Sequence, residues 1–155
     1  MSLIRQIRRT AGPSGDGALQ AGILPWRRGD KGVELLLITS RGGNRWIIPK
    51  GWPMPRKSLR QSACQEAFEE AGIRGEADLE PVGSFVTDKT DLLGRTRQLQ
   101  VIVYGMEVHE ELSDWPEKAL RQRRWCSGEE AARVVESASL RAMVEAFVQR
   151  GCEGA

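Results

Sequence analysis

Three glutamates near the middle of the chain have the residue type and the spacing to support catalysis. Glu66, Glu69 and Glu70 stand at positions i, i+3 and i+4, which places three carboxylates on one face of a helix. Each like-charged pair at this spacing costs roughly 0.2–0.5 kcal/mol unless a positive charge compensates it. A divalent cation is one compensation, since carboxylate oxygens suit magnesium, manganese or calcium. A solvated acidic face balanced by Arg60 or Arg74 is the alternative interpretation.

The residues around these glutamates predict a single helix with defined ends. Ser58, followed three residues later by Gln61, is a capping-box start, and Gly72 supplies a left-handed stop. We therefore expect a helix over residues 59–71. The side away from the glutamates repeats small and apolar residues at the helical period and gives the helix a face to bury: Cys64, Ala67, Phe68 and Ala71. The carboxylates are then expected to line a surface or a cleft.

The stretch from residue 51 to residue 73 resembles the Nudix box, the pattern G-x5-E-x7-R-E-U-x-E-E-x-G-U, in which U is a bulky aliphatic residue. Three positions depart from it: Lys57 replaces the first glutamate, Gln65 replaces the arginine, and Ala67 is smaller than the usual aliphatic residue. Six residues fall on fixed positions of the box in register: Gly51, Glu66, Glu69, Glu70, Gly72 and Ile73. The resemblance is strongest over residues 45–75 and extends over about residues 18–150.

The segment RWIIPKGW is similar to the Nudix group that includes diphosphoinositol polyphosphate and diadenosine polyphosphate hydrolases. The resemblance implies an enzyme that uses Mg2+ or Mn2+ to hydrolyse a diphosphate linkage in such a phosphate-rich substrate. It implies that Glu66, Glu69 and Glu70 are catalytic and metal-binding, with Glu66 also a candidate general base, and that Gly51 offers its carbonyl to the metal. Gln65 can replace the box arginine only as a neutral hydrogen-bond donor, so we expect an active but altered site.

Members of the family often take a further catalytic or metal-binding glutamate from a loop outside the box. Glu117 in the segment DWPEK is our candidate, with Glu110 and Glu111 as alternatives. The segment from Trp115 to Glu117 could instead simply anchor a lid over the site.

Cations near the predicted box loop point to a phosphorylated ligand, because guanidinium groups bind phosphate oxygens in pairs. Trp26, Trp46 and Trp52 could stack on a nucleobase or pack in the core, so a nucleotide and an inositol pyrophosphate both stay open as substrates. We expect four cations to bind the substrate: Arg27, Arg45, Lys50 and Lys57.

Length and composition predict one globular domain. The chain has 155 residues, of which 40% are hydrophobic and 28% charged, as is ordinary for a soluble protein with one core. We expect a mobile leader over residues 1–17, the domain over 18–150 and a tail over 151–155. A single histidine, His109, excludes a His-rich zinc site, and three separated cysteines without a CxxC motif suggest neither zinc nor a disulfide framework.

Charge and hydropathy bear on partners and location. A formal net charge of +2 is too small to indicate a protein that coats nucleic acid, and charge alone names no partner. The resemblance to the Nudix family implies a small phosphorylated one. The sequence contains no run of about 18 apolar residues and no signal-peptide core, which favours a cytoplasmic protein without a membrane partner. Many relatives in the family form homodimers, although nothing in the sequence marks an interface.

The order of the predicted elements indicates an α/β (α+β) fold of the Nudix type, a mixed sheet sandwiched between helices in a single domain. The apolar run from Leu35 to Ile38 suggests a strand covered on both faces. The expected elements are a hairpin of strands at 18–26 and 33–39, a short strand at 46–49, strands at 79–87 and 98–108, a loop at 109–124, a short strand around Trp125, and helices at about 129–136 and from Ser137 or Ser139 to about 149.

Two other functions remain open from the sequence. The chain could be a non-catalytic Nudix-like module that binds a nucleotide or polyphosphate, since the box arginine and the first glutamate are both replaced. It could also be a pyrophosphohydrolase that acts on RNA ends, in which case binding would depend steeply on salt.

Overall fold

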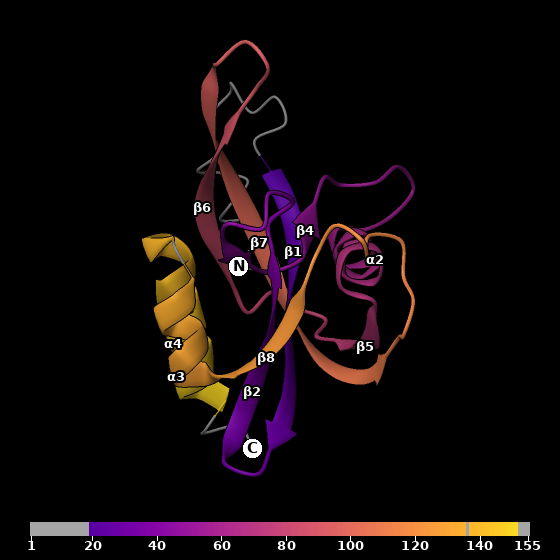
Figure 1. Cartoon of the computed structure of the whole chain (residues 1–155), viewed down its shortest axis with the longest axis vertical. Coiled ribbons are helices and arrows are strands. Elements are labelled where there is room, and N and C mark those ends of the chain that lie inside the picture. Colours follow the sequence, from indigo (N-terminus) through magenta and orange to yellow (C-terminus); the bar gives the residue numbers. More distant parts are fainter. Residues whose placement is uncertain (1–18, 136, 152–155) are drawn as a thin grey trace.

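A computed structural model describes residues 19–135 and 137–151 and shows the predicted mixed sheet between helices. Helix α2 lies on one side of the sheet, and α3 and α4 lie on the other (Figure 1). The strands are β1 (Leu19–Gly29), β2 (Gly32–Thr39), β3 (Trp46–Ile47), β4 (Lys50–Gly51), β5 (Ile73–Ala77), β6 (Gly83–Thr90), β7 (Thr96–Glu111) and β8 (Arg123–Ser127), and the helices are α2 (Leu59–Ala71), α3 (Gly128–Val134) and α4 (Ala138–Gly151).

Strand β1 is central to the sheet. It pairs in parallel with β7 and antiparallel with β2, and its first half also pairs with the short strand β4, where Ala21 faces Gly51. Strand β7 pairs with β6 along its first part and with β5 along its last part. This pairing holds the start of the box, β4, against the middle of the sheet.

The predicted apolar run on β2 is buried on both faces, as expected. Leu35 and Leu37 belong to the core cluster under α3 and α4, whereas Leu36 and Ile38 belong to the cluster under α2. All four side chains are fully buried. The predicted core stripe of α4 is also confirmed, since it packs on the first cluster: Leu140, Met143, Val144, Phe147 and Val148.

Helix α2 has the predicted range and the predicted ends. The Ser58 hydroxyl accepts the N–H of Gln61, the Gln61 side chain accepts the N–H of Ser58, and Gly72 closes the helix at φ 64°. Its buried face is rotated from the predicted one, because the sheet approaches the small side chains of Ala63, Ala67 and Ala71. Cys64 and Phe68 are only half-buried, whereas Glu70 is buried.

The sequence analysis missed one strand and misplaced the bounds of others. Strand β5 was not predicted, because only its two ends are buried and its sequence lacks alternation. The strand expected from residue 79 begins at Gly83, and Leu79 is 81% exposed. The expected loop at 109–124 is shorter, since pairing with Ile73 and Arg74 extends β7 to Glu111. These boundaries depend on partners far away in the sequence.

The C-terminal helices begin near the expected caps. The Ser127 hydroxyl accepts the N–H of Glu130 at the start of α3, and the Ser137 hydroxyl accepts the N–H of Leu140 at the start of α4. Ser139, the alternative cap, instead accepts the N–H of Val86. The predicted leader at 1–17 and residues 152–155 of the predicted tail lie outside the described residues. Within the described part, no helix has the length and apolar character needed to span a membrane.

The end of α2 gives a test of packing. Both Gly72 and Gly94 have positive φ, but a Cβ at residue 72 would lie 2.5 Å from the Trp115 ring, whereas one at residue 94 would meet nothing within 4 Å. We expect Gly94→Ala to lower the free energy of unfolding by about 1 kcal/mol through backbone strain alone. Gly72→Ala should cost about 1–3 kcal/mol more, as overpacking does. Urea denaturation measures both, and equal losses would contradict the close packing of Trp115.

Candidate active site

The carboxylates of α2 lie directly against strand β4. A Cβ on residue 51 would overlap the carboxyl group of Glu66, so the close approach of helix and strand requires glycine there. One residue earlier, the backbone N–H of Lys50 donates to Glu70 Oε1 at 3.3 Å. The box therefore folds back on itself, with its first strand in contact with two of its glutamates.

Burial and crowding change the proton affinity of these carboxylates. Burial raises the pKa of Glu70 to about 8, although the guanidinium of Arg121 opposes the rise, and the charge of Glu66 adds to it. Burial also raises the pKa of Glu66, and the neighbouring charge of Glu69 adds to that rise. Both carboxyl groups thus hold protons more tightly than exposed glutamates do.

Glu117 joins this cluster from the loop between β7 and β8. Its backbone N–H donates to the carbonyl of Glu69 at 3.0 Å, and its carboxylate lies 3.1 Å from the Arg121 Nε. The negative charge of Glu117 raises the pKa of both Glu66 and Glu70. The structure thus brings the loop candidate together with the box glutamates.

The two alternatives to Glu117 lie elsewhere. Glu110 is 3.5 Å from the Arg74 guanidinium, on the exposed side of β7. Glu111 accepts the ring N–H of Trp125 at 3.0 Å. Both glutamates are at the end of β7, where their side chains contact β5 and β8 residues rather than α2.

Arg121 is a site residue that the sequence analysis missed. Its side chain is 8% exposed, and it lies 3.7 Å from Glu70 Oε2 as well as against Glu117. It also donates to the carbonyl of Thr39 at 3.0 Å, which fixes the guanidinium at the end of β2. The spacing of i and i+4 between Glu117 and Arg121 was the available signal.

Gln65 acts as the predicted neutral donor. Its side-chain amide donates to Glu69 Oε1 at 3.0 Å, one helical turn away. Glu69 is therefore oriented by the Gln65 amide, whereas the buried guanidinium of Arg121 reaches Glu70 from the 112–122 loop.

Trp115 anchors the 112–122 loop on the end of α2. Its ring N–H donates to the Glu70 carbonyl at 3.1 Å, and the Arg123 guanidinium stacks 4.0 Å from the ring centre. Arg123 also donates to the carbonyl of Ala71 at the end of the helix and to that of Gly72, which accepts the N–H of Leu112 as well. Trp115 thus holds the loop on α2, and the same loop brings Glu117 to the box glutamates.

The four predicted substrate-binding cations fall in three places. Lys50 and Arg45 line one pocket of about 290 Å³ with Trp46 and Phe85, next to the carboxylate cluster through the Lys50 backbone. The ammonium group of Lys50 donates to Gln20 at 3.1 Å, and burial lowers its pKa.

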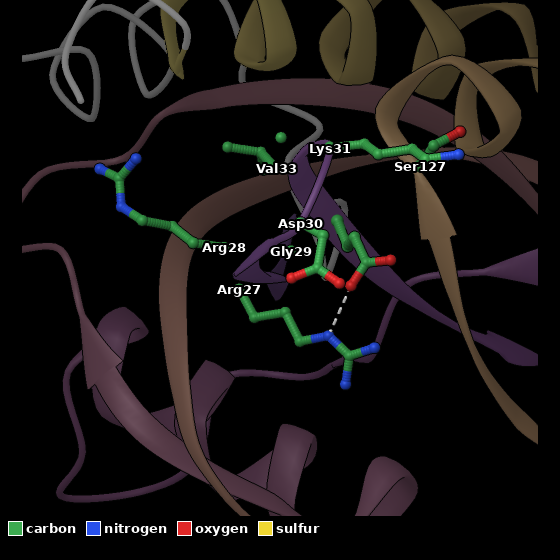
Figure 2. Close-up of a pocket in the computed structure, with 9 residues that line it drawn as sticks. Arg27, Arg28, Gly29, Asp30, Lys31, Val33 and Ser127 are labelled. Carbon is green, nitrogen blue, oxygen red and sulfur yellow. Dashed lines mark hydrogen bonds and ion pairs between the residues drawn. The ribbon is translucent and has the colours of Figure 1, made fainter.

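Lys57 and Arg27 are not brought to this pocket. Lys57 lines a separate groove on α2. Arg27 lies in the groove at the tip of the β1–β2 hairpin, where it pairs with Glu34 at 2.8 Å (Figure 2). It is six residues along β1 from Ala21, the partner of Gly51, which is a separation of about 20 Å along the strand.

The donor set fits a hard divalent cation. The carboxylates of Glu66, Glu69 and Glu70 and the carbonyl of Gly51 offer only oxygen, and the bare Cα of Gly51 leaves room for the Glu66 carboxyl group. In residues 19–135 and 137–151, no three acidic, His or Cys side chains already surround one point as a complete metal site. Mg2+ and Mn2+ are cations of this hard class, and Mg2+ commonly shares its coordination between a few carboxylates, water and substrate phosphates.

Comparison with known proteins agrees with the geometry. The NUDIX domain model matches residues 18–147, most of the chain. The chain belongs to the Nudix family. Both the fold and the box geometry described above are therefore those of a Nudix domain.

Three relatives illustrate the match. Nudix hydrolase 4 of Arabidopsis thaliana is 30% identical over 124 residues, which cover 77% of this chain and 56% of that protein. Diphosphoinositol polyphosphate phosphohydrolase 3-beta of Bos taurus is 32% identical over 112 residues, 70% of this chain and 64% of that protein. The structure of a C. elegans Ap4A hydrolase binary complex shares the fold with a TM-score of 0.66 at 20% identity, covering 89% of this chain and 99% of that one.

The raised pKa of Glu70 predicts how the stability of this Nudix domain depends on pH. Between its ordinary pKa of 4.5 and about 8, the folded state binds more protons than the unfolded state, so the free energy of unfolding falls as pH rises. Glu70→Gln removes this penalty and should stabilise the protein by on the order of 1–3 kcal/mol at about pH 8, with little change at about pH 4.5.

Urea denaturation in a chelating buffer at both pH values measures this difference. Glu110→Gln is the matched control, because that carboxyl group is exposed and outside the cluster. Destabilisation by Glu70→Gln at both pH values would contradict the assignment of a costly buried charge.

Proposed function

We propose that this Nudix domain is a divalent-metal-dependent hydrolase that cleaves a diphosphate linkage in a small, phosphate-rich molecule. The observation that carries the proposal is the packing of Glu66 and Glu70 against β4, with Glu117 and the buried Arg121 beside them. A diphosphate repels anionic nucleophiles, so its hydrolysis needs both positive charge and a proton acceptor.

The residues divide these tasks by their surroundings. A divalent cation held by the α2 carboxylates and the Gly51 carbonyl would neutralise phosphate charge and activate water for attack. Glu66 is the candidate proton acceptor, because burial and Glu69 raise its pKa towards the working range of a general base. Gln65 orients Glu69, and Arg121 holds Glu70 and Glu117 in place.

The pocket beside the cluster supports binding of a phosphorylated substrate. Arg45 and Lys50 supply positive charge there, beside Asp88, and the half-buried ring of Trp46 supplies flat apolar surface. A diadenosine polyphosphate or a diphosphoinositol polyphosphate fits this combination of charge and surface. The names of the C. elegans and bovine proteins support the same two substrate classes.

A binding module without turnover is the second candidate. It is favoured by Lys57 and Gln65, which replace the two other charged positions of the box, and by the Arg121 guanidinium, which lies where it already compensates Glu70. Binding of a nucleotide or polyphosphate without hydrolysis would support this alternative.

The primary test is a hydrolysis assay with Mg2+ and Mn2+ over diadenosine polyphosphates, nucleoside triphosphates, nucleotide sugars, inositol pyrophosphates and a triphosphorylated RNA. We expect turnover of a small substrate, with a loss of about 100-fold or more in Glu66→Gln and Glu70→Gln, because removal of a general base costs 10²–10⁴-fold. Glu110→Gln should retain the wild-type rate. Unchanged turnover in both box variants would refute the carboxylate assignment, and cleavage of the RNA alone would redirect it to RNA ends.

Metal binding can be tested without turnover. Mn2+ should raise the midpoint of thermal unfolding of the wild-type protein, since a ligand that binds only the folded state stabilises it. Glu66→Gln and Glu70→Gln should lose most of this rise, and Glu110→Gln should keep it. An equal rise in all four proteins would place the metal outside the cluster.

A further inference from the structure

A second concentration of charge lies on the outer face of α2, beside the carboxylates but facing away from the sheet. Here an open groove of about 490 Å³ is lined by four cations, and no acidic residue is among its described lining residues. Its cations come from the turn before the helix, from its first turn and from β5: Arg56, Lys57, Arg60 and Arg74. The half-buried ring of Phe68 and the half-buried side-chain amide of Gln65 also line the groove.

Two of these cations are fixed in place by the fold. The Arg60 guanidinium donates to the carbonyl of Ala77 at 2.6 Å and to that of Asp78 at 3.0 Å. Arg74 lies over the Phe68 ring at 5.0 Å and keeps one exposed ion pair, 3.5 Å from Glu110. Backbone carbonyls fix the Arg60 guanidinium in place, while the carboxyl groups of Asp78 and Glu110 offset part of the charge of Arg60 and Arg74.

The other two cations have no acidic partner in the described part of the chain. Arg56 and Lys57 are exposed, and no described carboxylate lies within ion-pair distance of either. Arg56 has φ 64°, and among the described residues it is the one non-glycine residue with a positive φ. The turn thus presents two adjacent side-chain charges to the groove at some conformational cost.

The start of α2 adds to the positive charge of the groove. Its first turn contains no acidic residue and carries Arg60, whereas the first turn of α3 contains Glu129 and Glu130. The N-terminal end of a helix is already positive, and acidic residues usually neutralise it. In α2 that positive end is left beside the cations of the groove.

Both charge-changing departures from the box lie in this groove. Lys57 occupies the position of the first box glutamate and Gln65 that of the arginine, and both line it. A glutamate at residue 57 would place a negative charge among the cations. Lys57 replaces a negative charge with a positive one, whereas Gln65 removes a positive charge and bonds to Glu69. The carboxylate cluster thus stays intact, and the groove has no acidic residue among its described lining residues.

We propose that this groove binds a condensed phosphate chain, independently of the carboxylate cluster and of any metal. Guanidinium groups bind phosphate oxygens in pairs, and a chain of linked phosphates can contact several cations at once. A single phosphate would leave most of the four charges unused. A nucleic acid is less well matched, because it is usually bound along a long basic track, whereas the whole chain carries a formal charge of only +2.

Inorganic tripolyphosphate is the probe, titrated calorimetrically at low salt in a chelating buffer, so that neither metal nor turnover contributes. The test variant is Arg56→Gly with Lys57→Gln. Glycine suits φ 64° at residue 56, so the fold should be retained. We expect the affinity to fall about tenfold or more, since each hydrogen bond to a charged group contributes about 1.5–3 kcal/mol.

The matched control is Arg28→Gln with Lys31→Gln, at the tip of the β1–β2 hairpin. Arg28 and Lys31 are exposed, as Arg56 and Lys57 are, and the two substitutions remove the same charge. Their groove, however, also contains Asp30 and Glu34 (Figure 2). The control should change the affinity less than twofold, and thermal unfolding should show both double variants folded. A second variant, Lys57→Glu, should weaken binding further than Lys57→Gln does.

Four results would overturn the proposal. The first two are an absence of tripolyphosphate binding to the wild-type protein and an equal loss of affinity in the control double variant. The third is a loss of affinity in Lys50→Gln, in the neighbouring pocket, but not in the groove variants, and the fourth is tighter binding of a single-stranded RNA that the groove variants weaken. Because the titration needs no hydrolysis, failure of the proposed enzymatic function would leave its outcome unaffected, and the reverse also holds.

Discussion

The close approach of α2 to β4 is the constraint around which the molecule is arranged. Glu66 packs on the bare Cα of Gly51, and Glu70 accepts the Lys50 backbone N–H while buried. Burial disfavours the charged form of a carboxyl group, and it raises the pKa of Glu70 to about 8, with the charge of Glu66 adding to the rise. The pairing of β4 with β1 holds one side of this contact, and the small buried residues of α2 let the helix come close enough to form the other.

The positive charge that offsets the burial of these carboxylates comes from a loop outside the box. Arg121 reaches Glu70 from the 112–122 loop, and Trp115 fixes the same loop to the end of α2. The loop is thus coupled to the carboxylates through a charge, a ring and the Glu117 backbone N–H. A loop attached in this way provides a catalytic candidate and covers the helix end with the same few residues.

The two flanks of helix α2 differ in charge rather than in apolar character. One flank carries the carboxylates that lie against β4, the groove on the other flank gathers cations, and Gln65 bonds to Glu69 between them. The buried face consists of small residues and Glu70. This arrangement explains why the helix is stable with little apolar surface, since its caps and its contacts with β1 hold it.

The sequence by itself determined what depends on near neighbours. The caps, length and left-handed stop of α2, the doubly buried run on β2 and the box register were all predictable, because capping and periodicity act over a few residues. Only the tertiary structure decided that Arg121 joins Glu70, that Arg27 does not, and that β5 pairs with the end of β7. Those outcomes depend on contacts between segments far apart in the sequence, as in the parallel pairing of β1 with β7, which brings together residues about 80 positions apart and leaves no local pattern in the chain.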